Sequence, residues 1–116
     1  MCQVEVNITQ GFDSDEKRLP EKERESLTKS LNEFVHNAKN GLFPKKLFRR
    51  KGVVFPNDIN KGDSSLYMLN ATESLCVILA FDNDSLFQQK IITLFRVVNK
   101  SQAVEAFNST ASLIYN

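Results

Sequence analysis

The stretch LYMLNATESLCVILAFDNDSLFQQKIITLFRVV (residues 66–98) decides the fold, because three apolar runs follow one another in it. The runs cover residues 66–72, 75–82 and 90–98, and short turn segments at 73–74 and 83–85 separate them. Apolar runs of this length that are joined by short turns predict an antiparallel three-strand meander. The middle run is apolar at nearly every position, which is typical of a central strand covered on both faces.

A strand and a helical hairpin are expected before the meander. Within residues 4–12, Val4, Val6 and Ile8 alternate with Glu5 and Asn7, which predicts a half-buried strand that ends near Gly11. A short helical turn is expected at 13–18. From about Pro20 to Lys39 the apolar residues recur at helical spacing, and Asn40-Gly41 can end the helix. The chain therefore enters the meander from an amphipathic helix.

The remaining segments complete an α+β pattern. Residues 42–65 contain two prolines and two glycines without a sustained period, so we expect an irregular connection with a short strand at 53–55. Residues 101–115 have apolar side chains at helical spacing and predict a C-terminal helix. Strands in a block with helices before and after predict a single α+β domain over residues 1–116, in which helices cover one face of a small sheet.

Composition excludes several classes of function. The chain has 116 residues, of which 41% are apolar and 25% are charged, the balance of a soluble globular protein. No apolar run reaches the roughly 18–20 residues that a membrane-spanning helix needs. The N-terminal residues lack the pattern of a signal peptide, so we expect a cytoplasmic protein with no membrane partner. Cys2 and Cys76 have no metal-ligand spacing and His36 is the only histidine, so we expect no metal and no cofactor.

Positive charge is concentrated in one short segment. Residues 45–62 hold six basic groups and one acidic group, a net charge of +5, whereas the whole chain carries +1. The segment FPKKLFRRKG (43–52) contains five of the basic groups: Lys45, Lys46, Arg49, Arg50 and Lys51. These side chains are candidate nucleic-acid-binding residues, because clustered lysine and arginine neutralise phosphates. The alternative is a solvated linker that the charges keep soluble.

Several local patterns resemble the RelE/ParE superfamily, the toxin components of bacterial type II toxin–antitoxin pairs. The resemblance rests on F-x-x-x-x-K-R-L-P (Phe12 to Pro20) before the long helix, D-I-N-K-G-D-S-S (58–65) before the meander, and IITLFRVVNKSQA (91–103) as the last strand with the basic residues after it. It implies a small bacterial protein whose partner is a cognate antitoxin. It also implies a target, which is either messenger RNA on the ribosome or DNA gyrase.

The resemblance also implies candidate catalytic residues for a metal-independent endoribonuclease. Lys100 keeps the basic position after the last strand, and Arg96 lies just upstream on that strand. Tyr115 and Tyr67 are the candidates for proton transfer. The family's strand lysines have no counterparts in residues 67–70, and Cys76 occupies the position of its strand arginine.

Two hypotheses remain open at this point. The chain is a RelE-like ribonuclease that uses these basic groups and a tyrosine, or it is a non-enzymatic binding protein of the same fold. The second class includes gyrase-inhibiting toxins and catalytically degenerate relatives that bind an antitoxin. Convergence of the basic residues of segment 45–51, Arg96 and Lys100 on one concave face of the sheet would favour the first hypothesis, and scattering of these residues would contradict it.

Overall fold

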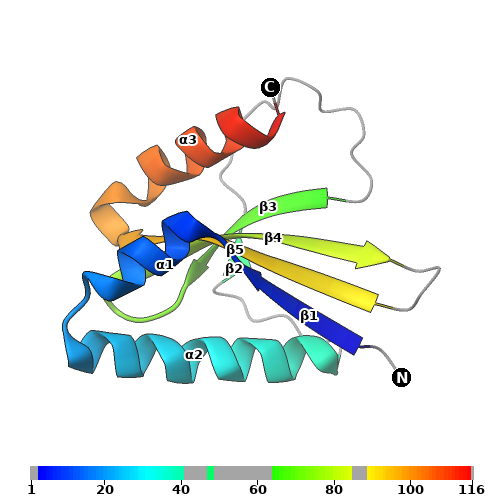
Figure 1. The fold of residues 1–116 in the computed structure, drawn as a ribbon, viewed down its shortest axis with the longest axis horizontal. Coiled ribbons are helices and arrows are strands. Elements are labelled where there is room, and N and C mark those ends of the chain that lie inside the picture. The colour runs from blue at the N-terminus through cyan, green and yellow to red at the C-terminus, as the bar shows by residue number, and fades with distance from the viewer. Residues whose placement is uncertain (1–2, 41–46, 49–63, 85–88, 116) are drawn as a thin grey trace.

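The computed structural model describes residues 3–40, 47–48, 64–84 and 89–115 (Figure 1). The elements in chain order are β1 (Gln3–Ile8), α1 (Gln10–Lys17), α2 (Glu21–Lys39), β2 (Leu47–Phe48), β3 (Ser64–Asn70), β4 (Leu75–Asp84), β5 (Gln89–Asn99), a 3-10 turn η1 (Lys100–Gln102) and α3 (Ala103–Tyr115). The predicted α+β class is confirmed, with an N-terminal strand and helical hairpin before the meander and a helix after it. Among the described residues, no helix combines the length and the apolar character that crossing a membrane demands.

The strands form one sheet in the order β1-β5-β4-β3-β2. β3, β4 and β5 are successive antiparallel neighbours, as the meander prediction requires. β1 pairs in parallel with β5, from Gln3 opposite Gln89 to Ile8 opposite Leu94. β2 pairs with β3 at residues expected to be irregular, and the short strand expected at 53–55 lies outside the described residues.

The helices divide between the two faces of the sheet, so the expectation that they cover one face is wrong. Alternate side chains of β4 explain the division: Leu75, Val77 and Leu79 belong to the core on the α2 side, and the side chains between them belong to the core on the α3 side. Figure 1 shows α2 along one face and α3 along the other. A strand that is apolar at nearly every position must be covered twice, because successive side chains point to opposite faces.

Each face has a core of its own. On the α2 side the largest fully buried side chains from the helices are Phe12, Leu27 and Phe34. On the α3 side Phe107 is fully buried among β3 and β4 residues, and three alanines of α3 are buried around it. Small side chains let a helix approach a sheet closely, so one large ring fills the space under α3.

β5 contains an irregularity where α1 crosses it. Ile78 pairs with Arg96 and Leu79 pairs with Leu94, so Phe95 is an extra residue in β5. β1 ends opposite Leu94, and Thr9 then caps α1 by accepting a hydrogen bond from the Phe12 amide. α1 therefore takes over the edge of β5 at the point where β1 stops.

Candidate functional site

Arg96 is held by Asp15 of α1. Arg96 Nε donates to Asp15 Oδ2 at 2.6 Å, and Arg96 Nη2 donates to Asp15 Oδ1 at 3.1 Å. The side chains are 39% and 10% exposed, respectively, so the carboxylate is the more deeply placed partner. Hydrogen bonding to Asp15 raises the pKa of the Arg96 guanidinium above its ordinary value. The positive charge of Arg96 is thus balanced within the fold.

The same carboxylate satisfies the backbone beside the irregularity in β5. The Val97 N–H donates to Asp15 Oδ2 at 3.1 Å. This group lies beyond the end of β1, where the β5 edge needs acceptors other than a neighbouring strand. On the same edge Thr9 Oγ1 donates to the carbonyl oxygens of Leu94 and Phe95 at 2.9 and 3.1 Å. Asp15 and Thr9 together replace the missing strand.

Close packing of α1 on β5 requires a glycine at position 11. A Cβ added there would lie 3.1 Å from the Phe95 carbonyl oxygen and 3.3 Å from Arg96 Cδ. The first of these atoms belongs to the backbone of the irregularity and cannot move freely. Gly11 therefore permits the approach that brings Asp15 to Arg96.

Lys100 and the two tyrosines lie on elements other than β5, which carries Arg96. Lys100 is exposed on η1, where its N–H donates to the Ser74 carbonyl oxygen at 3.0 Å. Tyr67 is partly buried and packs on the core cluster of the α2 side. Tyr115 ends α3, about 18 Å along the helix axis from Ala103 at 1.5 Å per residue. Tyr67 therefore lies on the α2 side of the sheet, whereas the helix that Tyr115 ends lies on the α3 side.

The predicted nucleic-acid-binding residues Lys45, Lys46, Arg49, Arg50 and Lys51 lie outside the described residues, so their role stays a prediction.

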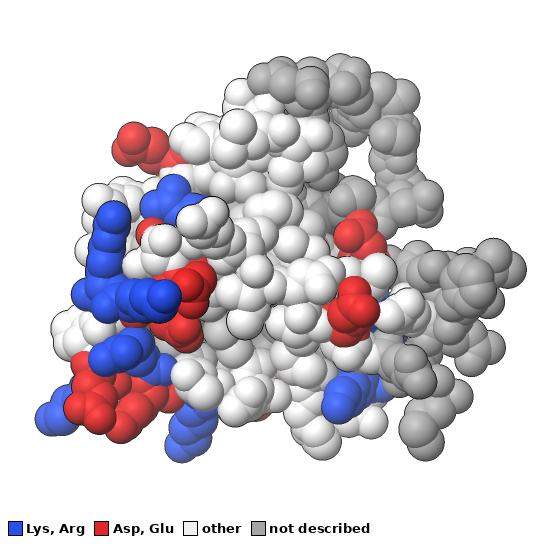
Figure 2. Space-filling view, viewed as in Figure 1, with Lys and Arg blue, Asp and Glu red and all other residues white. Residues whose placement is uncertain are grey.

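Figure 2 shows charged side chains of both signs gathered over the end of α1 and the start of α2, while the centre of this face carries few charges. The described residues contain no group of three or more histidine, cysteine, aspartate or glutamate side chains that could hold a metal ion.

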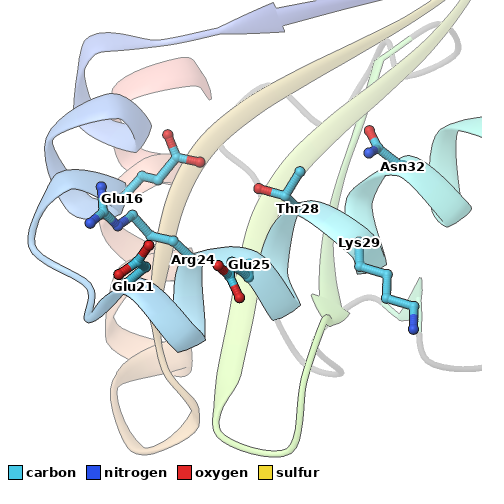
Figure 3. A pocket seen from close by; sticks show the side chains of 7 residues that line it. All are labelled: Glu16, Glu21, Arg24, Glu25, Thr28, Lys29 and Asn32. Atoms are coloured by element: carbon cyan, nitrogen blue, oxygen red, sulfur yellow. The ribbon is translucent and has the colours of Figure 1, made fainter.

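A polar hollow lies between α1 and α2. Seven side chains line it: Glu16, Glu21, Arg24, Glu25, Thr28, Lys29 and Asn32. Figure 3 shows Arg24 and Lys29 extending in opposite directions, so the two cations do not converge on one ligand position. Three carboxylates alternate with these cations along exposed helix surface, which is the pattern of a solvated helix face.

An apolar groove lies between β1 and α2. The floor and walls are made by Val6, Ile8, Phe12, Leu31, Phe34, Val35, Ile92 and Leu94, and the volume is about 440 Å³. We call it the β1 groove. Val6 and Ile8 are 38% and 60% exposed although they are large apolar side chains. Glu16, Thr28, Asn32, His36 and Lys39 also line the groove. It is open, mainly apolar and bordered by a sheet edge, which are properties of a protein-binding surface.

Sequence reasoning identified Arg96 but missed Asp15 and the β1 groove. An arginine within an apolar strand must reach solvent, a carboxylate or a ligand, and this requirement is the signal that could have led to Asp15. The groove had no comparable signal, because alternation in β1 predicts a buried face without saying how much of it a helix covers.

No protein-family model matches this chain, and no curated protein or solved structure matches it.

Proposed function

We propose that this chain is the toxin component of a bacterial type II toxin–antitoxin pair and acts as a non-enzymatic binding protein of the RelE/ParE type. The observation that carries the choice of a binding role is the Arg96–Asp15 pair, in which two side-chain hydrogen bonds hold the guanidinium. Arg96, one of the two cationic candidates for a catalytic role, is thereby a structural group.

Metal-free cleavage of RNA needs cationic donors aimed at one phosphate and a proton-transfer group within hydrogen-bond reach of the attacking hydroxyl. The carboxylate of Asp15 opposes the field of Arg96 at a phosphate. Tyr67 packs on the α2 side of the sheet, whereas Tyr115 ends the helix on the other side. These positions favour binding over catalysis.

Two further features support the proposal. The order of strand, helical hairpin, meander and helix is the one that the resemblance implies. The β1 groove offers exposed apolar area of the kind that protein partners cover. The partners implied are the cognate antitoxin and a target such as DNA gyrase, with the basic segment at 45–51 as a candidate contact for an acidic or phosphate-bearing partner.

Controlled expression in a bacterial host tests the proposal. We expect growth arrest without cleavage of the messenger RNA on translating ribosomes. We expect Lys100→Ala, Tyr67→Phe and Tyr115→Phe to arrest growth as the wild type does, and Arg49→Ala with Arg50→Ala to weaken arrest through lost binding. Lys17→Ala, at an exposed position of α1, is the control for surface charge.

Cleaved messages would refute the binding role, above all if Lys100→Ala or either tyrosine variant abolished the cleavage. Absence of arrest by the wild-type chain, at an expression level confirmed by immunoblot, would refute the toxin assignment. Trapped gyrase–DNA complexes during arrest would identify gyrase as the target.

A further inference from the structure

We propose that two copies of this chain associate through the free edge of β1, with the two strands antiparallel across a two-fold axis at Val6. This association needs only two copies of the chain, whichever macromolecule the chain targets. Four observations carry it: the direction of the β1 backbone groups, the composition of the strand, the exposure of its side chains and the position of its single charge.

Among the described residues, β1 has one edge with which no other strand pairs. The Thr9 N–H donates to the Leu94 carbonyl oxygen at 3.1 Å, so the backbone groups of Thr9 face β5. Successive residues of a strand direct these groups to opposite sides, and Val4, Val6 and Ile8 therefore direct theirs away from β5. β1 is the last strand on its side of the sheet within the part of the chain that the structure describes.

This edge lacks the features that normally prevent pairing. The strand QVEVNI contains no lysine, proline or glycine, which are the residues that blunt exposed edges. The outward-bonding residues Val6 and Ile8 are β-branched, and they expose 38% and 60% of their surface on the α2 side of the strand. An unprotected edge beside exposed apolar surface is a template for another strand.

The strand is complementary to a reversed copy of itself. With the axis at Val6, Val6 faces the partner's Val6 and Val4 faces the partner's Ile8, and the outward backbone groups form about six hydrogen bonds in hydrogen-bonded pairs. Glu5 then faces the partner's Asn7, whose amide N–H groups can donate to the carboxylate. Glu5 is the only charged residue of β1, and this register keeps it away from its own copy.

Other registers are poorer. An axis at Glu5 would set the two carboxylates opposite each other, which is unfavourable in a cross-strand pair. An axis at Asn7 would leave Val4 opposite the partner's Gln10, which lies in α1 and not in a strand. The register at Val6 uses the whole strand, and its two-fold symmetry closes the assembly at a dimer.

Dimerisation would also extend the β1 groove. In the Val6 register, Val4, Val6 and Ile8 of both copies lie on the α2 side of one continuous sheet. Their exposed parts become neighbours across the axis, so apolar surface is removed from water on the face where the groove is open. Burial of apolar surface therefore stabilises the dimer on the α2 side of the sheet, whereas the polar pair of Glu5 and Asn7 lies on the opposite side.

Sedimentation equilibrium of the purified full chain, over a wide range of concentrations, tests the proposal. We expect a reversible monomer–dimer equilibrium. Asn7→Lys would face the partner's Glu5 twice per dimer, and we expect it to lower the dimer Kd by roughly two- to thirty-fold; Asn7→Glu would raise it by a similar factor. Both changes fall on an exposed residue. Asn99→Lys and Asn99→Glu, at an exposed position beyond the β1 pairing, are matched controls that we expect to leave the Kd unchanged.

Val6→Pro provides a second test, because proline removes an N–H that β5 does not use and edge strands tolerate it there. We expect a folded monomer by circular dichroism and sedimentation. If this variant fails to fold, the dimer Kd values of Asn7→Lys and Asn7→Glu still test the pairing through β1. A wild-type chain that stays monomeric up to its solubility limit overturns the inference. So does a dimer whose Kd is the same for Asn7→Lys and Asn7→Glu, or a foreign polypeptide found paired with β1 in its place.

Discussion

Replacing Asp15 with alanine tests whether the charge of Arg96 is structural. The change removes the acceptor of the Val97 N–H and of two Arg96 donors. A part-buried N–H without a partner costs about 1–3 kcal/mol. Arg96 is 39% exposed, so water recovers much of its hydrogen bonding and the lost ion pair adds less than about 1 kcal/mol. We expect the free energy of unfolding to fall by about 2–3 kcal/mol.

Urea unfolding followed by circular dichroism measures this loss, and the melting temperature should fall by about 8–12 °C for a domain of this size. Asp13→Ala is the matched control on the same helix. Asp13 Oδ2 lies 3.0 Å from Lys17 Nζ, but the two side chains are 49% and 74% exposed, so we expect a loss below about 0.5 kcal/mol. Equal losses of unfolding free energy for Asp15→Ala and Asp13→Ala would refute the structural role of the Arg96–Asp15 pair. Arg96 would then again be a candidate phosphate-binding group.

Three further predictions concern stability. Thr9→Val keeps the shape of the side chain but removes its hydrogen bonds to α1 and β5, and should cost about 1–2 kcal/mol in urea unfolding; an unchanged midpoint would contradict the capping role. Phe107→Ala should cost about 3–5 kcal/mol because the ring is fully buried under α3, whereas Leu113→Ala, at 85% exposure, should stay within about 0.5 kcal/mol; similar losses would mean that α3 is not anchored by this ring. Burial raises the pKa of the Cys76 thiol above its ordinary value of 9.0. Above this pH the thiol loses its proton in the unfolded chain first, so the free energy of unfolding should fall by at most about 1.4 kcal/mol per pH unit. This pH dependence should be absent from Cys76→Ala, and the same pH dependence in both proteins would contradict a buried Cys76 thiol.

Most elements follow from local patterns, whereas their arrangement does not. The helix expected at about 20–39 is α2 (Glu21–Lys39), and the three apolar runs are β3, β4 and β5. Periodicity reports which side of an element is buried, but it does not say which strand lies beside β1. The parallel pairing with β5 joins segments more than 80 residues apart. The continuous apolar run of β4 did carry the information that both faces are covered.

The candidate site, too, could be predicted from the sequence only in part. Arg96 could be recognised because a charge inside an apolar strand needs a partner. Its pairing with Asp15 could not be predicted, since it depends on an extra residue at Phe95, on a glycine at position 11 and on where β1 ends. None of these features leaves a local sequence pattern that specifies the others.

The parallel pairing of β1 with β5 also has a consequence for how the chain folds. β1 is synthesised well before Gln89–Leu94, the residues that supply its hydrogen-bonding partners. During that interval its Val and Ile side chains have only the adjacent helices to cover them. Pairing over so long a sequence separation makes folding slow, because a large loop must close before the contact forms. β1 is therefore placed late although it is synthesised early relative to β5, and chains interrupted before β5 would expose β1 on both edges and be prone to aggregate.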